Sequence, residues 1–182
     1  MSSEAFATAL ISATPSPELA RETHLFDFLI GDWDLNARVH DDCGNVNSSQ
    51  GELLSSWVLE GRAIQDLFIF PRRIDRQTRR PSPGDRYGTT VRVYDHSRQS
   101  WRVYWINPAD EKTSGELRAH PDGSDVMLTG VLWDGTEVRW FYRDITATSF
   151  RYRAEKLAPD RRWQLYLELD GQRQQTAAPL ES

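Results

Sequence analysis

Three charged residues stand among aromatic positions in segments whose alternating polarity is typical of half-buried strands: Asp66, Arg92 and Arg139. A charge inside a protein is costly unless it is paired, so one interpretation is an internal ion pair from Asp66 to Arg92 or Arg139. The other is that one arginine stays free and binds an anionic ligand, because a planar guanidinium fits a carboxylate. Aromatic walls with few polar anchors are typical of a small-molecule site.

Tight turns predict which side chains of neighbouring strands share a face. In an antiparallel hairpin the turn length sets the register, and the register decides which residues lie opposite each other. Turns at residues 60–61 and 96–99 group the following side chains on the inward face: Leu53, Trp57, Ile64, Asp66, Phe68, Thr90, Arg92, Tyr94, Trp101, Val103 and Trp105.

Two later turns extend this inward face. A two-residue turn at Asp134-Gly135 and a four-residue turn at residues 146–149 place Arg139 and Phe141 inside, together with Tyr152. An error of one residue in either turn would reverse the strand faces. The predicted ligand-binding residues are therefore Trp57, Asp66, Arg92, Trp105, Arg139, Phe141 and Tyr152.

The elements that carry these residues are about ten short strands of period two, nearly all joined by tight turns. No long helical pattern interrupts them, which excludes parallel βαβ units. Ser16 and Pro17 are a good N-cap and first residue for one short helix before the strands. We predict an all-β chain that forms a single antiparallel up-and-down β-barrel with a short N-terminal helix.

Composition limits the function classes. The 182 residues suit one domain, predicted at 18–171 between flexible tails at 1–17 and 172–182, with a rim loop or lid at 71–86. A net charge of −5 argues against a nucleic-acid partner. The single Cys43 excludes an internal disulfide, and neither a signal peptide nor a 20-residue apolar run is present, so we expect a cytoplasmic protein without a membrane partner. Outward tryptophans favour a homodimer.

The segment 26–33 places a helical turn before Gly31-x-Trp33 at the start of the first strand. This pattern resembles the signature of lipocalins and their calycin relatives, which implies that Trp33 plugs one end of the barrel. Further stretches resemble an uncharacterised bacterial calycin-like family, a domain of unknown function: residues 58–66, Arg92-x-Tyr94-Asp95, Trp101 with Trp105, and 144–146 with Phe150. The resemblance implies a fold and no activity, because fold does not carry function.

Metal and cofactor sites are not expected. His24, His40, His96 and His120 lack metal-ligand spacing. Nitrobindin-like haem barrels are also similar to the predicted fold, but they hold iron through a histidine near the barrel end, whereas all four histidines here precede the last strands.

Three functions fit these residues. The first is binding of a small hydrophobic or aromatic, anionic ligand in the barrel. The second is a cofactor-independent lyase, isomerase or cyclase, with Asp66 as the catalytic acid or base and Tyr152 or Tyr104 donating to an oxyanion. The third is a barrel that serves assembly and holds no ligand; its interior would be packed solid with side chains.

Overall fold

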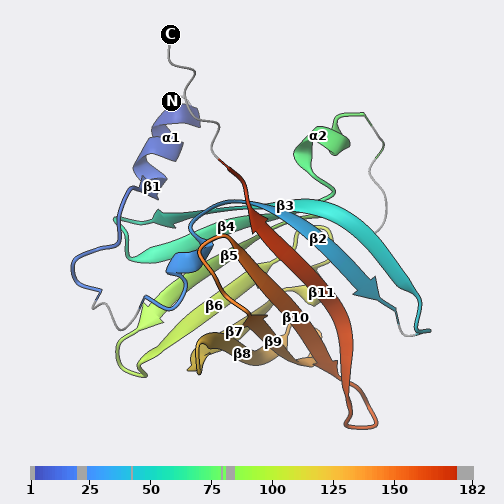
Figure 1. Ribbon diagram of the computed structural model, residues 1–182. Coiled ribbons are helices and arrows are strands. Elements are labelled where there is room, and N and C mark those ends of the chain that lie inside the picture. Colours follow the sequence, from blue (N-terminus) through green and yellow to red (C-terminus); the bar gives the residue numbers. More distant parts are fainter. Residues whose placement is uncertain (1–2, 20–23, 42, 79, 81–84, 176–182) are drawn as a thin grey trace.

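A closed β-barrel forms the body of the protein (Figure 1). The computed structural model describes residues 3–19, 24–41, 43–78, 80 and 85–175. Ten strands each pair antiparallel with the next along the chain, and β11 pairs with β2 to close the barrel. These strands are β2 (Gly31–His40), β3 (Val46–Val58), β4 (Ala63–Phe70), β5 (Arg86–Asp95), β6 (Ser100–Ile106), β7 (Gly115–Asp122), β8 (Asp125–Leu132), β9 (Glu137–Arg143), β10 (Ser149–Leu157) and β11 (Trp163–Arg173). The predicted fold class is confirmed.

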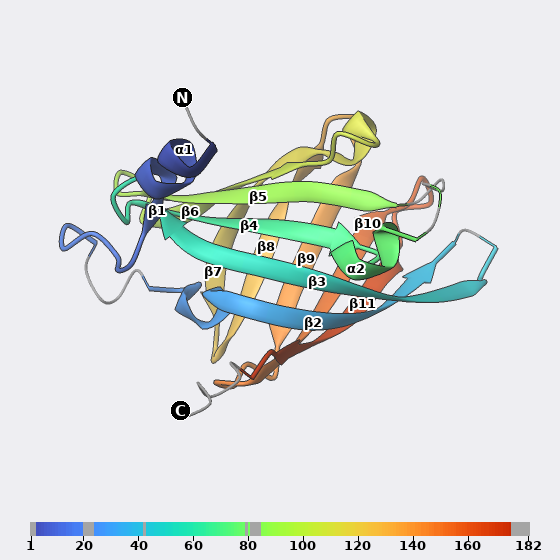
Figure 2. The same cartoon turned by 90° about the horizontal axis from the view of Figure 1, so that it is seen from above.

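Several short helices and one short strand lie outside the barrel strands. The N-terminal helix α1 (Ser3–Leu10) runs into the two-residue strand β1 (Ile11–Ser12), which pairs with the end of β3. Helix α2 (Arg73–Arg76) follows β4 and lies outside the wall, toward the opposite end of β3 from α1 (Figure 2). Two 3-10 helices, η2 (Asp27–Leu29) and η3 (Glu111–Thr113), precede β2 and β7. None of the helices described is long and apolar enough to cross a membrane.

The helix lies earlier in the chain than the predicted start at Ser16. The backbone of Ser16 instead donates to Gly61 O at 2.9 Å, and only a turn follows it. Part of the expected rim loop, at residues 79 and 81–84, falls outside the described residues, and its first half contains α2. Its last residue, Arg86, already belongs to β5.

One end of the barrel is closed by aromatic side chains. Phe26, Leu29 and Trp33 are fully buried, and the Trp33 indole N–H donates to Leu29 O at 2.9 Å. Phe26 packs edge-on against Trp101 of β6 at 5.6 Å, while Trp33 meets Phe150 of β10 at 4.8 Å. Since these contacts reach strands on different sides of the barrel, η2 and Trp33 plug this end.

Candidate functional site

A cavity of about 280 Å³ lies inside the barrel beyond the plug. This is near the small end of the range for ligand pockets. Its walls are mainly apolar and come from most strands, including Leu53, Phe68, Val103, Trp105, Leu128 and Trp140. Polar side chains line it as well: Arg92 and Tyr142 contact the plug residue Phe26, with Asp66 paired to Arg92, and the other polar residues of the lining include Arg86, Asp134, Tyr152, Lys156 and Tyr166.

Asp66 and Arg92 form a buried ion pair at the cavity floor. Arg92 Nη1 donates to Asp66 Oδ2 at 2.5 Å, and Arg92 Nη2 donates to the Tyr142 hydroxyl at 3.3 Å. The two charged residues are at most 2% exposed. Burial alone would lower the pKa of Arg92, but the charge of Asp66 and the contact with Tyr142 raise the pKa overall. The guanidinium therefore stays charged, and Asp66 neutralises it.

The floor also holds polar atoms without partners. Ser55 Oγ, Asp66 Oδ1 and Arg92 Nε are buried and have no hydrogen-bond partner among the described residues. Ser55 lies opposite Asp66 in the β3–β4 register, so the unpaired atoms lie on neighbouring strands. Buried polar atoms of this kind normally contact a water or a ligand.

Two further tyrosines, Tyr152 and Tyr166, line the cavity. Burial raises the pKa of Tyr152 well above its ordinary value. Burial likewise raises the pKa of Tyr166, although the hydrogen bond from Trp140 and the charge of Arg86 oppose this effect. Both hydroxyls therefore keep their protons at neutral pH and remain hydrogen-bond donors.

The structure brings four of the predicted site residues together at the cavity: Asp66, Arg92, Trp105 and Tyr152. The registers expected for the β3–β4 and β5–β6 hairpins are confirmed. Trp57 faces inward, opposite Ile64, but packs near the His24 ring and is outside the cavity lining.

Arg139 and Phe141 lie on the outer face of the barrel, so their predicted inward orientation is wrong. The β8–β9 turn has three residues, because Leu132 N donates to Thr136 O at 2.9 Å and Gly135 adopts a φ of +89°. This shifts β9 by one residue and turns Val138, Trp140 and Tyr142 inward instead. Outside, Arg139 pairs with Glu155 and lies over the Trp163 ring at 4.4 Å.

The β9–β10 turn differs by one residue as well. Tyr142 lies opposite Tyr152, and Asp144 adopts a left-handed φ of +51°. The two errors compensate each other, so the predicted faces of β8 and β10 are correct and only the face of β9 is reversed. Phe150 and Tyr152 themselves point inward as expected.

Arg86 and Tyr166, two of the cavity residues that the prediction missed, were missed for different reasons. Arg86 was assigned to the rim loop, although its even spacing from Thr90 and Arg92 along β5 would have placed it on the inward face. Tyr166 is the extra residue of a β-bulge, since Ala154 pairs with Leu167 and the next residue, Glu155, pairs with Leu165. Alternation along β11 could not have revealed it, because a bulge breaks the period of two.

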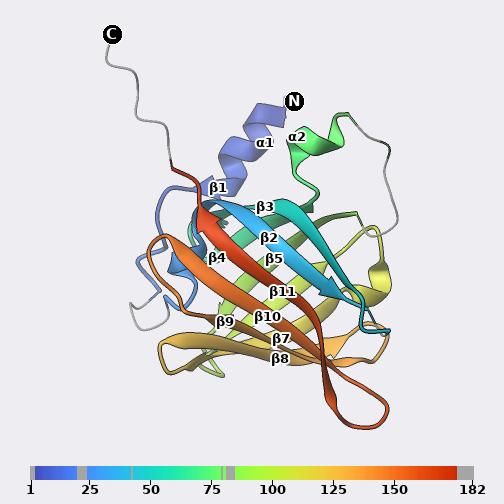
Figure 3. The same ribbon diagram turned by 45° about the vertical axis from the view of Figure 1, so that its right-hand side comes forward.

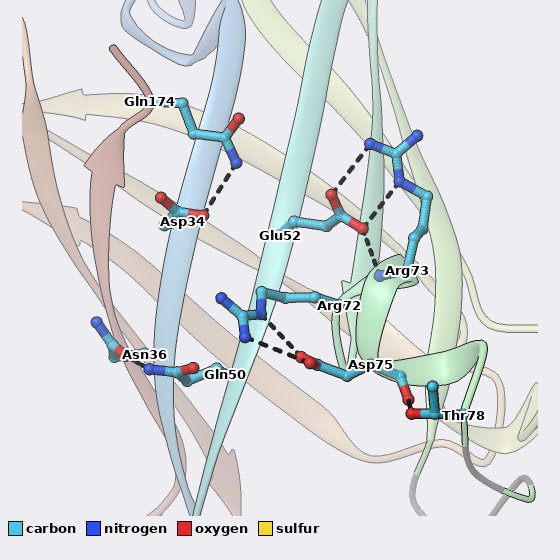
Figure 4. Close-up of polar contacts among 9 residues, drawn as sticks. All are labelled: Asp34, Asn36, Gln50, Glu52, Arg72, Arg73, Asp75, Thr78 and Gln174. Carbon is cyan, nitrogen blue, oxygen red and sulfur yellow. Dashed lines mark hydrogen bonds and ion pairs between the residues drawn. The ribbon is translucent and has the colours of Figure 1, made fainter.

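A second hollow lies between α2 and the outer faces of β2 and β3, and its charged side chains are paired (Figure 4). Glu52 accepts hydrogen bonds from the Arg73 backbone at 2.7 Å and from its guanidinium at 2.9 and 3.1 Å. Asp34 accepts from Gln174 at 2.9 Å. The contacts between Glu52 and Arg73 anchor α2 to the wall, so we assign the hollow a structural role. No cluster of three or more His, Cys, Asp or Glu side chains suited to a metal ion occurs among the residues described.

Comparisons with known proteins support the fold alone. No protein-family model and no curated protein matches the chain. The crystal structure of Rv2717c from M. tuberculosis is similar, with a TM-score of 0.56 over 86% of this chain and 99% of that chain. The two sequences are 13% identical. A likeness at this identity extends to the barrel and not to a ligand or an activity.

Proposed function

We propose that the protein is a calycin-like binding protein that takes a small hydrophobic or aromatic, anionic ligand into its barrel. The observation that supports this proposal is the cavity of about 280 Å³, with mainly apolar walls and several polar side chains. Enclosed apolar pockets with few, well-placed polar groups are typical of small-molecule sites. A cavity also differs from the solid interior expected of a barrel that serves assembly alone.

Native mass spectrometry of protein purified without added ligand tests this proposal. We expect a small molecule bound at one per chain, released when the same sample is denatured. Leu132 lines the cavity, whereas the neighbouring Val131 is 47% exposed on the outer face. Leu132→Trp should therefore reduce occupancy by filling the cavity, while the control Val131→Trp should not. A wild-type protein that releases nothing, or equal occupancy in both variants, would contradict the proposal.

A second candidate function, a cofactor-independent lyase or isomerase, is favoured by Asp66. One oxygen of this cavity carboxylate is engaged by Arg92, but Oδ1 has no partner among the described residues. A carboxylate with one free oxygen has the geometry of a general base. Incubating the released molecule with wild type and with Asp66→Asn distinguishes catalysis from binding. Turnover by the wild type that Asp66→Asn loses supports catalysis. A homodimer and a cytoplasmic location stay predictions.

A further inference from the structure

We propose that the ligand is an aromatic carboxylic acid whose carboxylate is bound by Arg86 and the hydroxyls of Tyr152 and Tyr166. Its apolar body would then point down toward the floor formed by Asp66 and Arg92. This inference rests on the proposed function, to which it adds a ligand class, an orientation and an anchoring residue.

Arg86 is a cavity cation without a carboxylate partner among the described residues. It lies on the inward face of β5, half-buried, and has no ion pair or hydrogen bond to any residue that the structure describes. Arg86 lines the same cavity as Tyr152 and Tyr166, and its charge acts on both tyrosines, as that of Arg92 also does on Tyr152. A guanidinium in this position can offer two parallel N–H donors to a carboxylate.

Trp140 orients the hydroxyl of Tyr166. The Trp140 indole N–H donates to the Tyr166 oxygen at 2.7 Å, and an indole nitrogen can only donate. The tyrosine oxygen is thus the acceptor in this contact, which leaves its own proton available to donate into the cavity. Tyr152 supplies a second O–H with no hydrogen-bond partner among the described residues.

The β-bulge is what brings Tyr166 to this position. On a regular strand Tyr166 would point outward, because its neighbour Leu167 points inward. The extra residue in β11 lets both side chains line the cavity. Bulges that re-aim a side chain are over-represented beside functional sites.

The floor is a poor place for the carboxylate. Asp66 already neutralises Arg92 at 2.5 Å, so an added anion there would meet a second negative charge. An ion pair with matched charges attracts a further anion weakly. The carboxylate is therefore better accommodated at Arg86, which faces the end of the cavity away from the plug.

The shape of the cavity favours a flat body. The Trp105 ring lies across Gly88, where a Cβ atom would come within 2.3 Å of it, and thus forms a flat wall between Arg86 and Thr90. Phe68 meets this ring edge-on at 5.7 Å. At the packing density of protein interiors, 280 Å³ holds roughly 200 Å³ of ligand, enough for a one- or two-ring acid.

Isothermal titration with 2-naphthoate and its neutral analogue 2-naphthamide tests the inference. The two molecules share one shape and differ in charge. We expect wild type to prefer the acid by about 10- to 100-fold, which is the ordinary worth of a charged hydrogen bond. Arg86→Gln should abolish this preference while leaving the affinity for the amide unchanged. Arg102→Gln, which removes an arginine from the outer face of β6, should behave as wild type.

Two further variants guard against misfolding. Arg86→Lys keeps the positive charge but lacks the two parallel N–H donors of the guanidinium, so it should retain part of the preference for the acid over the amide. Tyr166→Phe removes one donor and should weaken acid binding several-fold, again with the amide unaffected.

Each remaining outcome has one meaning. Acid preference that persists in Arg86→Gln would overturn the anchoring role of Arg86 and leave the proposed function standing. Equal binding of acid and amide by wild type would overturn the ligand class. If wild type binds neither molecule, both the inference and the proposed function fail.

Discussion

At the scale of single residues, the pair of Arg92 and Asp66 is the most sensitive feature of the interior. Arg92→Met would leave the Asp66 carboxylate buried without its partner. Breaking a buried pair from one side costs about 3–5 kcal/mol. We expect a loss of this size in the free energy of unfolding, measured by urea denaturation.

The matched control removes both charges. In Asp66→Leu/Arg92→Met the uncompensated charge is gone, so most of the lost stability should return. An Arg92→Met protein within about 1 kcal/mol of wild type would show that the carboxylate is not stranded.

The buried tyrosines predict a dependence of stability on pH. Burial raises the pKa of Tyr152 and of Tyr166 in the folded state, whereas in the unfolded chain they titrate near 10. Stability is therefore complete below about pH 10 and falls as the pH rises further, by up to about 1.4 kcal/mol per pH unit for each tyrosine.

Urea unfolding between about pH 8 and pH 11 measures this slope. Tyr166→Phe should reduce it, because this variant removes one of the two buried hydroxyls. Equal slopes in wild type and Tyr166→Phe would mean that Tyr166 titrates alike in both states.

Much of the site could be predicted from sequence where a strand is regular. Asp66, Arg92 and Trp105 were found because the β3–β4 and β5–β6 turns have the expected lengths. Arg139 and Phe141 were misplaced because the β8–β9 turn has three residues, with Gly135 at positive φ. The Asp134-Gly135 pair is compatible with both a two-residue and a three-residue turn, so it does not distinguish them. Tyr166 depends on a bulge, which responds to packing between β10 and β11 rather than to local composition.

At the scale of elements, the plug is held by the last strand. Arg173 donates to Ile30 O at 2.5 Å, to Phe28 O at 2.7 Å and to Ala147 O at 2.7 Å, and its guanidinium lies 4.3 Å from the Trp33 ring centroid. Arg173→Met leaves these carbonyls without their charged donor. We expect a loss of about 1.5–3 kcal/mol in urea unfolding.

Arg151→Met is the matched comparison, because Arg151 is 71% exposed and pairs only with exposed or partly exposed carboxylates among the described residues. Its effect should stay within about 1 kcal/mol. Equal losses in the two variants would argue that Arg173 does not hold the plug.

The number and order of the strands followed from sequence because each hairpin turn and each period of two is a local signal. The position of the helix did not, since α1 is fixed by β1 pairing with the far end of β3, a contact between distant segments. Figure 3 shows the hairpin of β10 and β11 projecting beyond the strands around it. The β-bulge lies within the paired residues of these two strands.

At the scale of the whole molecule, the barrel wall itself forms the cavity. The described residues show no lid over it. Each of its ten strands pairs on both sides, so the wall has no free edge. Large apolar side chains nevertheless remain outside, such as Trp133 at 64% exposure. The predicted homodimer would cover such residues, and sedimentation velocity measures it directly.

A preformed cavity also predicts how a ligand changes global stability. A ligand that binds only the folded barrel stabilises it by about 2.7 kcal/mol at a hundredfold excess over its Kd. We expect 2-naphthoate to raise the free energy of urea unfolding by this amount with an unchanged m-value, because the surface exposed on unfolding stays nearly the same. At the same acid concentration, the gain in Arg86→Gln should shrink by about 1.4 kcal/mol for each tenfold loss of affinity. A rise in the m-value on adding the acid would instead mean that the empty barrel is partly open and that the ligand completes its folding.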